Sequence, residues 1–147
     1  APARDLGAFL DALIFNFLIG NTDAHGKHYS VMLDGPGAVR LAPLYDLLCT
    51  TVFPDTGKKL AMRYGGENRP KYLRRRHLER LADELEVRPR LVFERSRKLI
   101  GAIGENRPAA RAMLPEEFRE RPILAAIDAA IEERRERLET ALTEPPA

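Results

Sequence analysis

Apolar side chains recur every three or four positions through most of this chain, and that spacing favours a mainly helical fold. The firmest segment covers residues 6–18, where one helix face collects Leu6, Phe9, Leu10, Leu13, Ile14, Phe17 and Leu18. Asp5 is the expected N-cap of this helix, and Gly20 with Asn21 is expected to end it. The same spacing predicts four later helices: 72–85, 89 to about 103, 109–120 and 122 to about 142, with a break at 104–108.

Two short runs, Tyr29–Leu33 and Ala38–Leu41, flank the turn residues Asp34-Gly35-Pro36-Gly37 and predict a β-hairpin. Residues 44–51 are expected to form a loop or a short helix, and 59–63 a short extended segment. The predicted fold class is therefore mainly α, with one short hairpin between the first helix and the later ones. A length of 147 residues suits one domain.

Composition excludes two classes of protein. No apolar run approaches the ~20 residues that a membrane-spanning helix needs. Cys49 is the only cysteine, which excludes a disulfide framework. No charged segment followed by an apolar one indicates a secretory signal, so we expect a cytoplasmic protein with no membrane partner.

Charge is distributed unevenly, although the net charge is only +2. Between Arg63 and Arg80 there are seven basic residues against two acidic ones. The run Arg74–Arg76 is expected to be a solvated helix face, with contact to an acidic partner as the alternative. In the last helix, the charged residues 132–137 predict an outer face.

The polar stretch from Gly20 to His28 follows the first helix and precedes the hairpin. It holds two of the three histidines beside an acid and a lysine. A second acid, Asp46, follows the return strand of the hairpin. Because a hairpin returns its end close to its start, we expect Asp46 to lie near Asp23 through His28.

Two carboxylates beside a lysine suit phosphoryl transfer, in which catalysis consists mainly of positioning and of neutralising charge. In a kinase catalytic loop, a base Asp is followed five positions later by a residue that helps to hold metal, and later by a metal-binding Asp. That pattern makes Asp23 the base, His28 the fifth residue and Asp46 the later metal ligand. The alternatives are a loop-capping role for Asp23 and a helix N-cap role for Asp46.

Three segments carry a family resemblance: FNFLIGNTDAHGK (15–27), YS (29–30) and LAPLYD (41–46). They resemble the HipA-type serine/threonine kinases, the toxins of bacterial type II toxin–antitoxin pairs. The resemblance is specific for about residues 13–50, and Lys59–Met62 and Gly65-Gly66 also look like the family. It implies the C-terminal lobe of a protein-kinase-like fold over 1–147, with a catalytic loop at 20–30, a metal-binding segment at 41–48 and a helical subdomain at 70–142.

The resemblance also implies ATP and Mg²⁺ as cofactors, with Asp23 as the catalytic base. It assigns cofactor binding to five residues: His25, Lys27, His28, Tyr45 and Asp46. Of these, Asp46 and His28 are the expected metal ligands. The family has Asn where this chain has His28, and Mg²⁺ prefers oxygen ligands to imidazole.

The partners that the resemblance implies are a helix-turn-helix antitoxin, operator DNA reached only through that antitoxin, and an aminoacyl-tRNA synthetase as protein substrate. The glycine-rich phosphate loop and ATP-pairing lysine of a kinase have no counterpart in these residues. We therefore expect them in an upstream lobe of the parent chain, and expect no phosphorylation by this chain unaided. Two alternatives remain: a non-catalytic, pseudokinase-like module that binds an antitoxin, and a metal-dependent hydrolase that uses Asp23, His25, His28 and Asp46 to bind Zn²⁺ or Mn²⁺.

Overall fold

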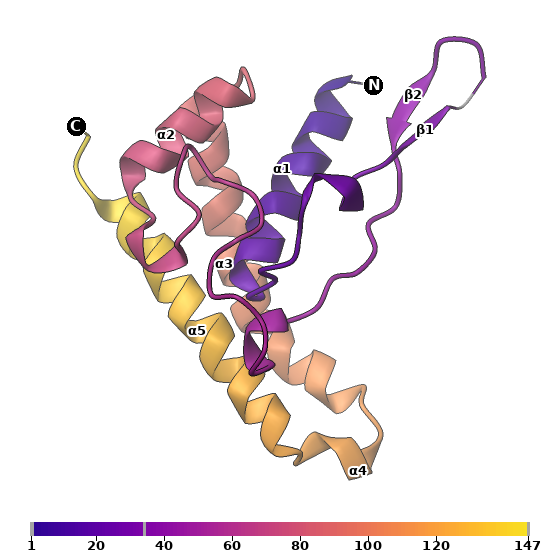
Figure 1. Ribbon diagram of the computed structural model, residues 1–147, viewed down its shortest axis with the longest axis vertical. Coiled ribbons are helices and arrows are strands. Elements are labelled where there is room, and N and C mark those ends of the chain that lie inside the picture. The colour runs from indigo at the N-terminus through magenta and orange to yellow at the C-terminus, as the bar shows by residue number, and fades with distance from the viewer. Residues whose placement is uncertain (1, 34, 147) are drawn as a thin grey trace.

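Helix α1 (Pro2–Leu18) occupies the centre of the computed structural model and contacts α3, α5 and strand β2 (Figure 1). The structure describes residues 2–33 and 35–146, and for Pro2 only the backbone. The other helices and strands follow in chain order: β1 (Val31–Leu33), β2 (Val39–Leu41), α2 (Arg75–Glu84), α3 (Pro89–Ala112), α4 (Glu116–Arg119) and α5 (Pro122–Thr143). Single 3₁₀ turns occupy Gly26–His28, Thr50–Val52 and Pro70–Tyr72. The predicted fold class, mainly α with one short hairpin, is confirmed.

The core forms around the apolar face of α1. Leu10, Phe17 and Leu18 are almost completely buried. They belong to one buried cluster with residues of α2, α3 and α5, including Leu78, Val92 and Leu138. Full burial of each such side chain stabilises the fold by roughly 1.5–3 kcal/mol, so this packing holds α1, and the loop that follows it, in a fixed position.

The hairpin is antiparallel, with Val31 paired to Leu41, and each strand is shorter than the sequence predicted. It projects from the helical body beside α1 (Figure 1). Arg40 of β2 anchors it by sharing its Nε–H between the two oxygens of the Asp5 carboxylate, at 2.9 and 3.2 Å. Asp34 of the predicted turn lies outside the described residues.

Helix boundaries differ from the prediction at Asp5 and at 104–108. Helix α1 begins at Pro2, so Asp5 lies inside its first turn and is not the N-cap. The predicted break at 104–108 is wrong, since α3 continues to Ala112. A Cβ on Gly104 would lie 2.8 Å from Nη2 of Arg135 in α5, so this glycine makes room for the neighbouring helix.

The segment predicted as a helix over 109–120 is split between the last turn of α3 and the short helix α4. The segment predicted over 72–85 is a 3₁₀ turn followed by α2. No regular helix follows Asp46, so its alternative role as a helix N-cap is wrong. Residues 59–63 form no strand, although Leu60 and Ala61 donate backbone hydrogen bonds to Asn68 and Thr22.

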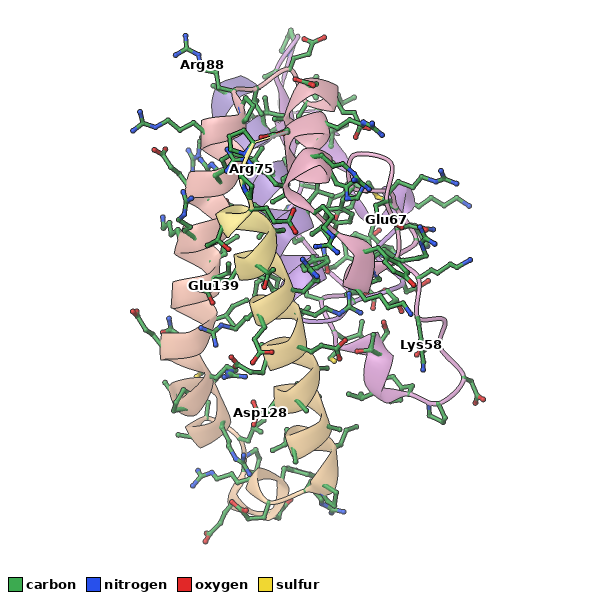
Figure 2. All side chains as sticks on the ribbon, turned by 90° about the vertical axis from the view of Figure 1, so that its left-hand side faces the viewer. Lys58, Glu67, Arg75, Arg88, Asp128 and Glu139 are labelled. Carbon is green, nitrogen blue, oxygen red and sulfur yellow. The ribbon has the colours of Figure 1, made fainter. Side chains whose placement is uncertain are left out.

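Charged residues join the start of α2 to the end of α5. Arg74 donates from Nη1 to Glu144 Oε1 at 2.8 Å, and the backbone N–H of Arg75 donates to Oε2 at 3.0 Å. Figure 2 shows Arg75 at the C-terminal end of α5. Two of the three arginines in the basic run therefore fix the start of α2 against the end of α5.

The prediction of an outer face over 132–137 is wrong at Arg134, whose side chain is buried. Its guanidinium lies over the Phe17 ring, 5.4 Å from the centroid, and burial lowers the pKa of Arg134. No helix among the described residues has both the length and the apolar character needed to cross a membrane.

Candidate active site

The polar loop leaves α1 through a tight turn at Gly20. This residue has a φ of +74°, and a Cβ there would lie 2.7 Å from Oγ1 of Thr51. The carbonyl of Gly20 accepts hydrogen bonds from the Thr51 N–H and the Thr50 hydroxyl, both at 3.2 Å. Glycine therefore fits both the left-handed backbone and the close approach of residues 50–51.

Asn21 connects the loop to the segment that carries the second acid. Its buried side-chain amide donates to Asn16 Oδ1 at 2.8 Å and to the carbonyl of Asp46 at 2.9 Å. Its Oδ1 accepts from the backbone N–H of Asp23 at 3.2 Å. One side chain thus positions the backbone at both Asp23 and Asp46.

A second buried contact supports the same loop. The backbone N–H of Thr22 donates to Thr50 Oγ1 at 2.7 Å, and the two threonine hydroxyls lie 2.8 Å apart. The sequence prediction missed these buried polar groups and Asn16, which donates to the Tyr29 hydroxyl at 3.1 Å. Asn16 interrupts the apolar residues of α1, and a polar residue in a buried segment is a signal from which a hydrogen-bond partner could have been inferred.

Asp46 has a left-handed backbone, with a φ of +57°. Side-chain-bearing residues rarely adopt this conformation, and it occurs often at functional sites. The Asp46 carboxylate is 44% exposed, and its Oδ2 lies 3.4 Å from Nε2 of His28. Asp46 therefore lies beside the polar loop, as the hairpin predicts.

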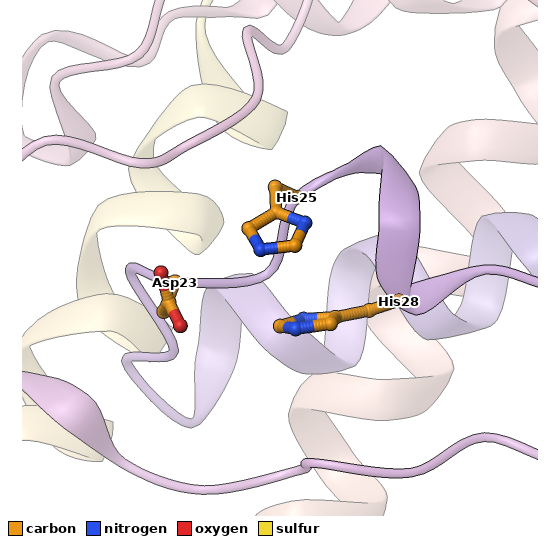
Figure 3. A group of neighbouring side chains, drawn as sticks. All are labelled: Asp23, His25 and His28. Carbon is orange, nitrogen blue, oxygen red and sulfur yellow. The ribbon is translucent and has the colours of Figure 1, made fainter.

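The side chains of Asp23, His25 and His28 lie close together on the polar loop (Figure 3). One ligand atom from each lies within 4.8 Å of the others. The two imidazole rings are 4.0 Å apart between centroids, with a 31° angle between their planes. Asp23 is exposed and the two histidines are half-buried, so the cluster is open to a molecule from solution.

Tyr45 and Lys27 complete the set of predicted site residues. The Tyr45 hydroxyl donates to the backbone carbonyl of Lys27 at 3.0 Å. The Tyr45 ring meets His28 edge-on, with 5.7 Å between centroids. Tyr45 thus lies against the histidine pair, whereas Lys27 joins the group through its backbone.

Beneath the site, burial raises the pKa of two tyrosines. Tyr64 is buried and donates its hydroxyl to the carbonyl of Leu13 at 2.8 Å, and desolvation raises its pKa. Desolvation also raises the pKa of Tyr29, an effect that the hydrogen bond from Asn16 partly offsets. Both hydroxyls therefore remain protonated near neutral pH and serve as fixed hydrogen-bonding groups under the loop.

Comparison with known proteins agrees on one family. The model of the HipA-like C-terminal domain matches residues 1–107. The protein Y4mE of Sinorhizobium fredii, named provisionally as a kinase, is 53% identical over 64 residues, which cover 44% of this chain and 15% of that protein. The serine/threonine-protein kinase toxin HipA of Shewanella oneidensis is 30% identical over 102 residues, 69% of this chain and 23% of that toxin.

A solved structure extends the likeness to nearly the whole chain. HipA of Shewanella oneidensis, in a complex with HipB and operator DNA, superposes with a TM-score of 0.81 at 26% identity. The match covers 96% of this chain and 32% of that one. The fold is thus that of the HipA C-terminal region, a protein-kinase-like fold, and the chain spans a third or less of the length of these relatives.

Proposed function

The chain belongs to the family of HipA-like C-terminal domains, and on that premise we propose that it is the catalytic C-terminal lobe of an ATP-dependent serine/threonine protein kinase. Within 1–147 we assign the catalytic loop to 20–30, the metal-binding segment to 41–48 and the helical subdomain to 70–142. The observation that carries the proposal is the double attachment of Asn21, which ties the backbone of Asp23 to that of Asp46.

Asp23 is the proposed catalytic base. Its carboxylate is exposed while its backbone is fixed by Asn21, so it is free to meet a substrate hydroxyl in a constant position. It would orient that hydroxyl and accept its proton as the phosphoryl group is transferred. Mg-ATP, when bound, supplies the phosphoryl group and neutralises the charge that develops on it.

Asp46 is the proposed Mg²⁺ ligand, because carboxylate oxygen is the donor that Mg²⁺ prefers. His28, also assigned to the metal, offers an imidazole, which fits Mg²⁺ poorly. We assign His25, Lys27, His28 and Tyr45 to the side of the site that faces the nucleotide and its phosphates. The contact between Tyr45 and the Lys27 backbone keeps these residues grouped.

An upstream lobe or partner is supported by the apolar surface beside the site. The exposed apolar residues of the hairpin and the Asp46 segment include Val31, Leu33, Val39, Leu47 and Leu48. Leu33 is 80% exposed. Leu33 and Val39 pair across the hairpin, and because exposed apolar patches commonly mark interfaces, we propose that the nucleotide-binding lobe of the kinase covers this surface.

Its partners are proposed from the family. The relative of known structure is found with HipB and operator DNA, so we propose an antitoxin partner of that kind, with DNA reached through it. An aminoacyl-tRNA synthetase is the proposed protein substrate, on the family resemblance.

Phosphoryl transfer from Mg-ATP by the native polypeptide that contains these residues tests the proposal. Asp23→Asn should lower the rate at least ~100-fold, the lower end of what a general base contributes. Asp55→Asn, which changes an exposed carboxylate outside residues 20–30, is the matched control. A rate for Asp23→Asn within twofold of the parent would exclude Asp23 as the base.

A second candidate is the non-catalytic interaction module, which the imidazole of His28 beside Asp46 favours. In that case the parent would transfer no phosphate, and Asp23→Asn would leave its cellular effect unchanged. Substitution of Arg74–Arg76 would then remove the effect instead.

A further inference from the structure

We propose that Asp23, His25 and His28 form a binding site for one divalent transition-metal ion of the Zn²⁺ type, with Asp46 orienting His28. The three residues lie within six positions of one loop, and their ligand atoms converge within 4.8 Å. Two ligand atoms each ~2.0–2.1 Å from a tetrahedral ion lie about 3.4 Å apart. Closing the cluster onto an ion therefore requires movements of about 1.4 Å or less between ligand atoms, which small side-chain rotations supply.

One ring nitrogen of each histidine in the cluster has no hydrogen-bond partner within the described part of the chain. Nδ1 of His25 and Nδ1 of His28 are both buried, and neither has a hydrogen-bond partner there. Buried polar atoms in native proteins are normally paired, so two unpaired ring nitrogens in one loop call for an explanation. A metal ion bound at Nδ1 of His28 supplies the partner that this nitrogen lacks.

Asp46 provides the support that a metal-binding histidine usually has. Its Oδ2 lies 3.4 Å from Nε2 of His28. With the ring proton held on Nε2 toward this carboxylate, Nδ1 of His28 carries the lone pair. A carboxylate that holds the far nitrogen of a histidine is the common arrangement around zinc, and it fixes the tautomer of the ring.

The donor set selects the class of ion. Two imidazoles with one carboxylate suit Zn²⁺ and its neighbours among the transition metals, whereas Mg²⁺ takes oxygen ligands. Asp23 is exposed and leaves room for a water molecule as the fourth ligand. An ion held by Asp23 would also occupy the proposed catalytic base, so Zn²⁺ should inhibit phosphoryl transfer; this consequence, unlike the binding itself, rests on the proposed function.

The test is calorimetric titration of the metal-free native polypeptide with ZnCl₂ and, separately, MgCl₂. We expect one Zn²⁺ per chain, bound at least 100-fold more tightly than Mg²⁺, and a visible absorption band when Co²⁺ replaces Zn²⁺. His25→Ala and His28→Asn should each weaken Zn²⁺ binding at least tenfold, and Asp46→Asn should weaken it 10–100-fold through His28.

Asp55→Asn, at an exposed carboxylate outside residues 20–30, is the matched control and should bind Zn²⁺ like the parent. Circular dichroism of each variant checks that it is folded. Zn²⁺ affinity no higher than that for Mg²⁺, or full affinity in both histidine variants, would overturn the proposal. Zn²⁺ binding without kinase activity would count against the proposed function alone, and kinase activity without Zn²⁺ binding against the metal site alone.

Discussion

Asn21→Ala tests whether one buried amide holds the site together. The variant removes the donors to Asn16 Oδ1 and to the Asp46 carbonyl, and the acceptor for the Asp23 N–H. Asn16 is 3% exposed, so its orphaned oxygen loses a partner that water does not replace. An unsatisfied buried group costs about 1–3 kcal/mol, and the two less buried partners add less. We expect a loss of about 2–4 kcal/mol in the free energy of unfolding.

Equilibrium unfolding in urea measures this loss from the shift of the midpoint, provided that the slope is unchanged. Asn106→Ala is the matched control, because that amide is exposed and bonds only within α3, and its effect should stay below about 0.5 kcal/mol. A double-mutant cycle with Asn16→Ala should show a smaller loss than the sum of the single variants, by about 1 kcal/mol. A loss below about 1 kcal/mol for Asn21→Ala would refute the role given to this side chain.

Three further predictions concern the segment around Gly65. Gly65→Ala should destabilise the protein by more than about 3 kcal/mol in urea unfolding, since the new Cβ would lie 1.9 Å from the His77 carbonyl oxygen at a φ of +55°; near-parent stability would contradict this. Hydrogen bonds from Arg69 hold the pKa of Glu67 at about 2, below its ordinary 4.5, so its stabilising contribution is present above pH 4.5 and is lost toward pH 2. Glu67→Gln should flatten that acid dependence in thermal melts. Burial lowers the pKa of His77 below 6.5, and its Nδ1 accepts the Arg74 N–H, so stability should fall as pH drops below 6.5, an effect that His77→Gln should abolish.

The features that depend on neighbouring residues, the buried face of α1 and the β-hairpin, could be predicted from the sequence. The apolar face of α1 is continuous in sequence, and the structure buries the residues it indicated, such as Leu10 and Phe17. The hairpin was visible from its turn residues, and a hairpin brings Asp46 back to the polar loop by geometry alone. The sequence was therefore enough to predict which residues form the polar loop and that Asp46 lies close to it.

The features that the sequence did not predict depend on contacts between distant segments. Residues 104–108 look like a helix break because glycine and proline weaken helices, yet α3 continues through them, with Gly104 beside Arg135 of α5. Arg134 stands in a run of charged residues, and only the fold shows that it turns inward onto Phe17. The buried contacts of Asn21 and Thr50 were likewise invisible, because a polar residue in a loop sequence gives no sign of whether it is buried.

The left-handed backbone at Asp46 has a consequence for how this sequence can change. A residue with a side chain is held there at a cost of roughly 1 kcal/mol, and glycine would relieve it. Selection for stability alone would therefore favour glycine at this position. If Asp46 holds Mg²⁺ as proposed, its left-handed backbone trades stability for activity, and Asp46→Gly is expected to be more stable and less active.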